Sequence, residues 1–324
     1  MAPLIVDPEW EKVWAHVVAS TPMPEFTDAA QVREYCTTAM KHGFAPFPVI
    51  EGVQETKHEV TSLDGARINV RRFVPPSLPT DTKAHRAIVY LFGGGMVSGS
   101  VELFRTFITN IAEASQSQVF GVDYRVGFEK PFPAAVEDVY SAVAWLQENA
   151  QTFDVDPARI LLFGPSAGGG VAAGTALFAR DRGLKYPLAG QVLVAPMIDD
   201  RTVLPKENPL TPYLTWTSAM NELGWKAYLG GKEREERTDE NVPIYAAPAR
   251  AKDVSGLPPT YIDVGSLDLF KNEDFAYAAK LAAAGVEVEF HIYLGIPHGF
   301  EGVASNIRLT QVPFQNQINF VKNI

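Results

Sequence analysis

The chain has 324 residues, of which 46% are hydrophobic and 20% charged, and its formal net charge at pH 7 is −10. This composition excludes an intrinsically disordered chain, and the acidic balance argues against nucleic acid or an anionic membrane surface as the main partner, because both favour clustered lysine and arginine. The single cysteine, Cys36, excludes an internal disulfide and a cysteine-based metal site.

The sequence contains no targeting or membrane signal. Its first apolar run, residues 4–6, is too short for the core of a signal peptide, and no run approaches the about 18 apolar residues that span a bilayer. We therefore expect a cytoplasmic protein without a membrane span.

The first 50 residues carry many aromatic side chains, interrupted by prolines. Trp10 and Trp14 have helical spacing, which predicts a first helix. A second helical pattern runs from about residue 28 to residue 41, with Thr27 or Asp28 as its expected N-cap.

From residue 57 onward, short runs rich in valine, isoleucine, tyrosine and phenylalanine alternate with helical patterns. This alternation predicts an α/β fold with a mostly parallel eight-stranded sheet and helices on both of its faces. The first two strands are joined only by the short turn 63–66, so we expect them to pair antiparallel at one edge. Strands are expected at 57–63, 67–74, 86–92, 118–123, 159–163, 190–195, 259–264 and 287–293, and the clearest helices at 134–150, 167–181 and 272–284.

Residues 199–250 interrupt this rhythm and are interpreted as a helical insertion above the sheet. A run of charged residues at 232–237 is expected to form a solvated face. The aromatic side chains of the insertion either form the core of its helices or line a pocket, and the sequence leaves both options open; they are Tyr213, Trp216, Trp225 and Tyr228.

The strongest motif is GPSAG at residues 164–168, which follows a predicted strand and precedes a run of small residues typical of a tightly packed helix. This is the context of a G-x-S-x-G nucleophile elbow, in which a strained turn exposes the serine at the carboxyl end of the sheet. Glycines at both flanking positions avoid crowding within the turn. Ser166 is therefore the candidate nucleophile, and a plain glycine turn is the alternative.

A second glycine-rich segment, FGGGM at residues 92–96, directly follows the third predicted strand. Its glycines leave backbone N–H groups unshielded, as an oxyanion hole requires. A phosphate loop is disfavoured because the Gly-Lys-Ser/Thr sequence is missing. We expect the N–H groups of Gly94, Gly95 and Ala167 to form the hole, with a one-residue shift to Gly93 as the alternative.

The candidate general base is His298, because it lies after the last predicted strand in a loop shaped by glycine and proline. The other histidines are expected to be structural or at the surface; they are His16, His42, His58, His85 and His291.

The candidate acid is Asp268, just beyond the end of the seventh predicted strand, which fits the chain order serine, aspartate, histidine. Asp263 lies within that strand. Asp199, which follows the sixth strand, is the alternative acid.

Together these segments resemble the α/β-hydrolase superfamily, and within it the hormone-sensitive-lipase-like esterases, which include plant and fungal carboxylesterases. Residues 122–135 are similar to the family's fourth-strand segment, and residues 155–160 to its lead into the nucleophile strand. Residues 257–260 are similar to the lead into the acid strand. The resemblance runs from about residue 60 to the end of the chain.

The chain departs from the family pattern at several positions near these motifs. Phe92 stands where the family usually has histidine, Pro165 where it has aspartate, and Gly170 where it has asparagine. Phe128 and Glu129 replace a Pro-Glu pair. These replacements suggest a specialised member of the family.

The resemblance implies a hydrolase core of residues 51–198 and 251–324 and a discontinuous helical cap of residues 1–50 and 199–250. Cys36 then falls in the cap, away from the chemistry. It further implies a serine esterase with a Ser-His-Asp triad, acting on small to medium apolar esters, with no cofactor and no metal, as a monomer or homodimer.

Two other functions stay open at this stage. An acyltransferase, thioesterase or cyclase of a biosynthetic pathway would use the same triad, and the replacements at Phe92 and Pro165 motivate this alternative. A non-catalytic ligand-binding receptor is the less favoured one, because a receptor group with this fold has lost the catalytic histidine, whereas His298 is present here.

Overall fold

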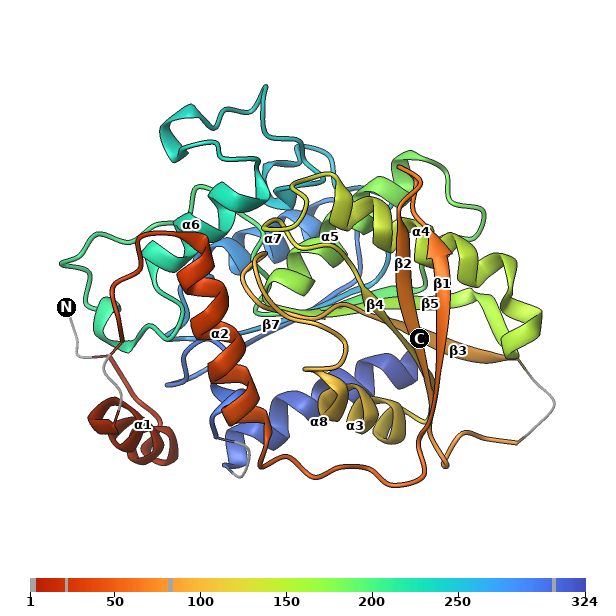
Figure 1. Ribbon diagram of the computed structural model, residues 1–324, viewed down its shortest axis with the longest axis horizontal. Coiled ribbons are helices and arrows are strands. Elements are labelled where there is room, and N and C mark those ends of the chain that lie inside the picture. The colour runs from red at the N-terminus through yellow and green to blue at the C-terminus, as the bar shows by residue number, and fades with distance from the viewer. Residues whose placement is uncertain (1–3, 21–22, 81–83, 305–306) are drawn as a thin grey trace.

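An eight-stranded sheet organises the chain in the computed structural model, which describes residues 4–20, 23–80, 84–304 and 307–324 (Figure 1). The strand order is β1-β2-β4-β3-β5-β6-β7-β8. β2 pairs antiparallel with β1 and with β4, and every other neighbouring pair is parallel. The strands are β1 (Gln54–Thr61), β2 (Arg67–Val74), β3 (His85–Tyr90), β4 (Gln118–Asp123), β5 (Val155–Pro165), β6 (Gly190–Val194), β7 (Thr260–Gly265) and β8 (Val288–Tyr293).

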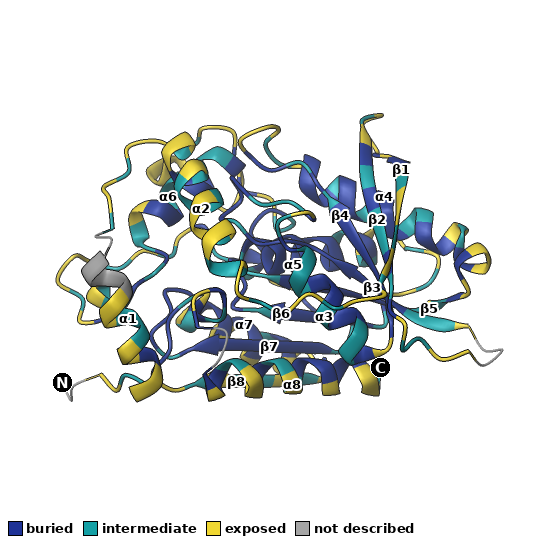
Figure 2. Cartoon of the chain, turned by 60° about the horizontal axis from the view of Figure 1, so that its bottom comes forward, coloured by how far each residue is buried: buried dark blue, intermediate teal, exposed yellow. Residues whose placement is uncertain are grey.

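Helices cover both faces of this sheet. α3 and α8 contact each other on one face, and α4, α5 and α7 lie on the other (Figures 1 and 2). The α-helices are α1 (Pro8–Ser20), α2 (Ala29–Phe44), α3 (Arg105–Ser115), α4 (Ala134–Glu148), α5 (Ala167–Asp181), α6 (Ser218–Tyr228), α7 (Lys271–Ala283) and α8 (Arg308–Asn323). The predicted fold class, a mostly parallel α/β sheet with an antiparallel hairpin at one edge, is confirmed.

The core lies between these layers because the central strands are apolar on both sides. β4 is buried except at its last residue, and every residue of β7 is buried (Figure 2). Continuous burial of this kind is typical of parallel strands covered by helices on both faces. The carboxyl ends of β3, β5, β6 and β7 therefore meet at one edge of the sheet.

The two N-terminal helices pack against segments near the carboxyl edge of the sheet. Asp28 caps α2 by accepting the N–H of Gln31 at 2.9 Å, as one of the two expected N-caps. α2 contacts α6, and the two helices lie side by side in Figure 1. α1 packs through Trp10 against a small apolar cluster that includes Ile296 and Phe300, on either side of His298.

The insertion differs from the expected helical segment in two respects. α6 is its single α-helix among the described residues, and the remainder is loop and short 3-10 turns. The charged run 232–237 is mostly exposed, but the side chain of Arg237 is fully buried, where it pairs with Glu222 and donates to the carbonyl of Asp200. The expectation of a wholly solvated face was therefore wrong at Arg237.

No helix in the described parts of the chain combines the length and the apolar character needed to cross a bilayer.

Candidate active site

Ser166 occupies the sharp turn between β5 and α5, with φ 55° and ψ −123°, a conformation that non-glycine residues rarely adopt. The flanking glycines make this turn sterically feasible. A Cβ on Gly164 would lie 2.3 Å from the carbonyl oxygen of Gly168, and a Cβ on Gly168 would lie 2.1 Å from that of Leu91. The turn is held to the sheet by the N–H of Ser166, which donates to the carbonyl of Val194 at 2.8 Å.

Ser166, His298 and Asp268 come together at the carboxyl edge of the sheet. Ser166 Oγ lies 2.8 Å from His298 Nε2, and His298 Nδ1 lies 2.8 Å from Asp268 Oδ2. The carboxylate of Asp268 is fully buried, and its other oxygen accepts the N–H of Phe270 at 2.9 Å. In this arrangement Nδ1–H donates to the carboxylate, which leaves Nε2 free to accept the serine proton.

Two opposing influences act on the pKa of His298. Burial lowers it, but the charge and hydrogen bond of Asp268, together with the charge of Glu301, raise it by more, so the net direction is upward from the usual value. The imidazole and the Phe270 ring lie nearly perpendicular to each other, with 5.0 Å between ring centroids. This environment stabilises the protonated form of the His298 imidazole beside Ser166.

The structure distinguishes between the two candidate acids. Asp268 lies at the imidazole, whereas Asp199 forms an ion pair with Arg201, at 2.7 Å, and its N–H donates to Glu273. Asp263 is buried within β7 and accepts hydrogen bonds from Tyr261 and Gln317.

The glycine loop that follows β3 lies against the serine turn. A Cβ on Gly93 would be 3.4 Å from the Cβ of Ser166. Gly94 and Gly95 adopt φ values of 135° and 62°, which their lack of a side chain permits. The carbonyl of Gly94 accepts three hydrogen bonds, from the N–H groups of Val97 and Ser98 and from the hydroxyl of Ser98.

The backbone N–H groups of Gly94, Gly95 and Ala167 have no acceptor among the described residues. Ala167 is also the first residue of α5, where the helix dipole favours negative charge. The three donors expected from the sequence are thus unused among the described residues. Ala167 directly follows Ser166, and Gly94 and Gly95 follow Gly93, which lies against the serine turn.

Phe92 takes a packing role at the position where the resembled family has histidine. Its ring stacks on Tyr124 at 4.1 Å between centroids, with 8° between the planes. The hydroxyl of Tyr124 donates to the carbonyl of Phe92 at 2.6 Å. A Cβ on Gly99 would lie 2.5 Å from the Phe92 ring, so glycine is needed beside it. The start of the glycine loop is fixed by aromatic stacking and one hydrogen bond.

Three residues of the 199–250 insertion contact the site loops, and only Trp216 among them was considered from the sequence, as part of either a helix core or a pocket. Thr215 Oγ1 donates to the carbonyl of His298 at 2.5 Å. The indole of Trp216 covers Gly95, since a Cβ there would be 2.0 Å from the ring. A Cβ on Gly224, in α6, would lie 2.4 Å from the carbonyl oxygen of Gly95. The insertion therefore packs directly on both loops.

Of the aromatic residues left open by the sequence, Trp216, Trp225 and Tyr228 are buried and Tyr213 is partly exposed. Trp225 and Tyr228 pack in the main core.

The position of Cys36 corrects an expectation. The Cys36 side chain lies near Ser98, the residue whose hydroxyl donates to the carbonyl of Gly94, so it is close to the glycine loop rather than away from the chemistry. Burial raises the pKa of the Cys36 thiol to about 12, although the nearby Ser98 side chain acts in the opposite direction.

Glu273 is a further residue that sequence reasoning missed. It is buried in α7, and one of its carboxylate oxygens accepts the N–H groups of Ile198 and Asp199 at 2.8 and 3.0 Å. It thereby holds the segment after β6 to the helix that follows Asp268. In the sequence, Glu273 stands out only as an acidic residue five positions after Asp268.

Comparisons with known proteins identify the family and the fold of this chain. A family model described as alpha/beta hydrolase fold matches residues 88–302, which include the glycine loop and the candidate nucleophile, acid and base. Esterase LipI of Mycobacterium tuberculosis is 35% identical over 247 residues, covering 75% of this chain and 74% of LipI. Carboxylesterase NlhH of the same species is 35% identical over 239 residues, covering 73% and 72% of the two chains. Among solved structures, a bacterial heroin esterase matches with a TM-score of 0.85 and 31% identity, over 98% of this chain and 97% of its own.

Proposed function

Because the chain belongs to the α/β-hydrolase fold family, among the hormone-sensitive-lipase-like esterases, we propose that it is a serine carboxylic-ester hydrolase that acts on small to medium apolar esters. The observation that carries this proposal is the hydrogen-bonded series Ser166, His298 and Asp268, with 2.8 Å between each pair of joined atoms.

The proposed mechanism proceeds through an acyl-enzyme. Ser166 Oγ attacks the ester carbonyl carbon while His298 Nε2 accepts the hydroxyl proton, and the imidazolium then gives this proton to the departing alcohol oxygen. Asp268 orients the imidazole and stabilises its charged form. In the second half, His298 takes a proton from water while the water oxygen attacks the acyl carbon. The imidazolium then returns the proton to Ser166 Oγ as the bond between Oγ and the acyl carbon breaks, which releases the acid and restores Ser166.

The negative charge on the tetrahedral intermediate is accommodated by the N–H groups of Gly94, Gly95 and Ala167. Donors that are already fixed need no reorganisation as the charge develops, which is why such groups accelerate acyl transfer. Their unused state among the described residues, together with the hydrogen bonds that fix the Gly94 carbonyl, supports this role.

The proposed cap consists of residues 1–50 and 199–250 over a core of residues 51–198 and 251–324. The contact between α2 and α6 supports the proposal that these two segments form one cap. Trp216 beside Gly95 and Phe270 beside His298 give the reacting carbonyl apolar surroundings, which suit an uncharged ester. No cofactor enters this mechanism, and the cytoplasmic location and the monomeric or homodimeric state stay predictions.

A panel of p-nitrophenyl esters with acyl chains from acetyl to dodecanoyl tests the function. We expect kcat/KM to be highest for short and medium chains and to fall for the longest. Failure to hydrolyse any of these esters would overturn the assignment. Adding a primary alcohol and analysing the products separates hydrolysis from acyl transfer, because a transferase would form the new ester in preference to the free acid.

A further inference from the structure

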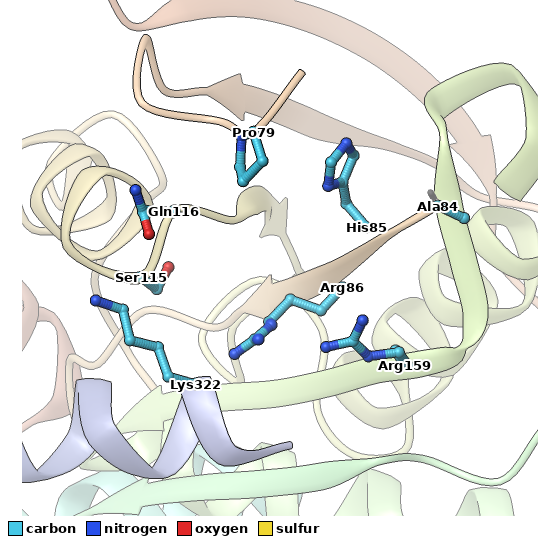
Figure 3. Close-up of a pocket in the computed structure, with 8 residues that line it drawn as sticks. All are labelled: Pro79, Ala84, His85, Arg86, Ser115, Gln116, Arg159 and Lys322. Atoms are coloured by element: carbon cyan, nitrogen blue, oxygen red, sulfur yellow. The ribbon is translucent and has the colours of Figure 1, made fainter. Parts of the chain in front are cut away.

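A hollow of about 390 Å³ lies at the edge of the sheet opposite the candidate active site (Figure 3). It is bordered by the start of β3, the end of α3, β5 and the end of α8, and by Pro79 and Ala84 from the segment before β3. β3 begins at His85, beside the hollow, and its other end leads into the glycine loop. The length of the parallel strands therefore separates the two places.

Three cationic side chains point into this hollow from three different elements. Arg86 comes from β3, Arg159 from β5 and Lys322 from α8, and Arg86 lies between the other two in Figure 3. Among the described residues, no carboxylate pairs with any of them. Elsewhere in this acidic chain, arginines such as Arg125 and Arg250 are paired with aspartates.

Most hydrogen-bond donors of these side chains meet no acceptor among the described residues. One Arg86 nitrogen donates to the carbonyl of Val321, near the end of α8. Within the part of the chain that the structure describes, Arg159 and Lys322 donate to no acceptor, nor does the side-chain amide of Gln116, which also lines the hollow. Two guanidinium groups and one ammonium group thus offer many N–H donors to a shared space.

Only two of the three cationic side chains have a role in stabilising the fold. Cations near the C-terminus of α8 interact favourably with the helix dipole, which accounts for Arg86 and Lys322. Arg159 lies on β5 and has no such role. Burial, and then the charge of Arg159, lowers the pKa of Arg86, so the positive charge of each of these two side chains acts against that of the other. A bound anion would remove that repulsion.

We propose that this hollow binds a small phosphate-type dianion, either inorganic phosphate or the phosphate group of a small monoester. A phosphate group offers several acceptor oxygens, and the planar fork of arginine matches them in pairs. The volume accommodates the phosphate together with a small organic substituent. The site is separate from the ester chemistry and does not depend on it.

Thermal unfolding of the full chain in phosphate and in chloride, at matched ionic strength, tests this site. The decisive variant is the double substitution Arg159→Gln and Lys322→Gln, which keeps Arg86 and its bond to Val321. The matched control is Arg308→Gln with Lys57→Gln, because both are exposed cations outside the hollow. We expect phosphate to raise the Tm of the parent and the control in a saturable way, with at least about tenfold weaker apparent affinity in the double variant.

A second titration with glycerol 3-phosphate identifies the source of the phosphate group. Tighter binding than inorganic phosphate assigns the site to a monoester, and equal or weaker binding assigns it to the free ion. An equal Tm shift in chloride, or an undiminished shift in the double variant, would overturn the proposal. Circular dichroism and ester hydrolysis confirm folding, and the two single variants replace the double one if it does not fold.

Discussion

Thr215 donates a hydrogen bond from its hydroxyl to the backbone carbonyl of His298 over 2.5 Å, which ties the 199–250 insertion to the loop of the candidate base. Thr215→Val keeps the shape of the side chain and removes the donor. We expect kcat for a short ester to fall about three- to tenfold, because one hydrogen bond that holds the His298 loop in position is lost.

The matched control for this prediction is Thr211→Val. Thr211 also donates its hydroxyl to a backbone carbonyl, that of Pro205, within the same insertion. An equal loss of kcat in both variants would mean that Thr215 acts only through the stability of the insertion. An unchanged kcat in Thr215→Val would show that the bond does not position His298.

Gly224 allows α6 to approach the glycine loop closely. Its substitution by alanine places a methyl group against the carbonyl of Gly95, where the available separation is 2.4 Å. The loop or the helix must move, so we expect kcat to fall between about tenfold and a hundredfold with little change in KM. Gly190→Ala is the control, because a Cβ at Gly190 meets only contacts of 3.5 Å. Full activity in Gly224→Ala would show that the close packing of α6 on the glycine loop does not position the proposed oxyanion donors.

The pH dependence of kcat/KM reports the proposed base. His298 acts in its neutral form, and its pKa lies above the usual value, so activity should rise with pH through a correspondingly raised pKa. The charge of Glu301 contributes to this increase, so Glu301→Gln should move the acidic limb of the profile to lower pH. Glu287→Gln, an exposed carboxylate, serves as the control. An unmoved limb in Glu301→Gln would contradict the assignment.

Asp263 makes the stability of the fold depend on pH. Burial raises its pKa to about 7, although hydrogen bonds from Gln317 and Tyr261 act in the opposite direction. Since the folded state holds the proton more tightly than the unfolded state, this contribution to stability is present below about pH 4 and is lost as pH rises through about 7.

Asp263→Asn mimics the protonated acid and can keep both hydrogen bonds, because Tyr261 and Gln317 donate to the same oxygen. We expect the variant and the parent to unfold at equal denaturant concentration near pH 4, and the variant to be more stable by up to about 4 kcal/mol at pH 8. Asp156→Asn, at a partly exposed site, should show no such divergence. Parallel stability curves for Asp263→Asn and the parent would contradict this account.

The sheet and the elements that carry the site could be predicted from the sequence because their signals are local. Runs of β-branched and aromatic residues marked every strand, although β5 begins four residues before its expected start at residue 159. α3 and α8 were not predicted. α8 is rich in polar residues and contains Pro313, and only packing on the sheet shows which of its side chains are buried.

The residues of the candidate site likewise fall into those with a local sequence signal and those without one. The positions of Ser166, His298 and Asp268 were predicted because turn residues and chain order indicate them, and the structure brings them together. Thr215 and Gly224 lie in an insertion without a motif, and their contacts with the site loops depend on tertiary packing that no local pattern records. The proximity of Cys36 to the glycine loop was missed for the same reason.

The central claim is that Ser166 is a nucleophile activated by His298. Intact-mass analysis after treatment with a fluorophosphonate tests it most directly. The parent chain, Ser166→Ala and His298→Ala are compared after each has been shown to be folded. We expect one phosphonyl group on the parent, none on Ser166→Ala, and labelling slowed by several orders of magnitude on His298→Ala. Labelling of Ser166→Ala at the parental rate, or a parent that is never labelled, would contradict the account.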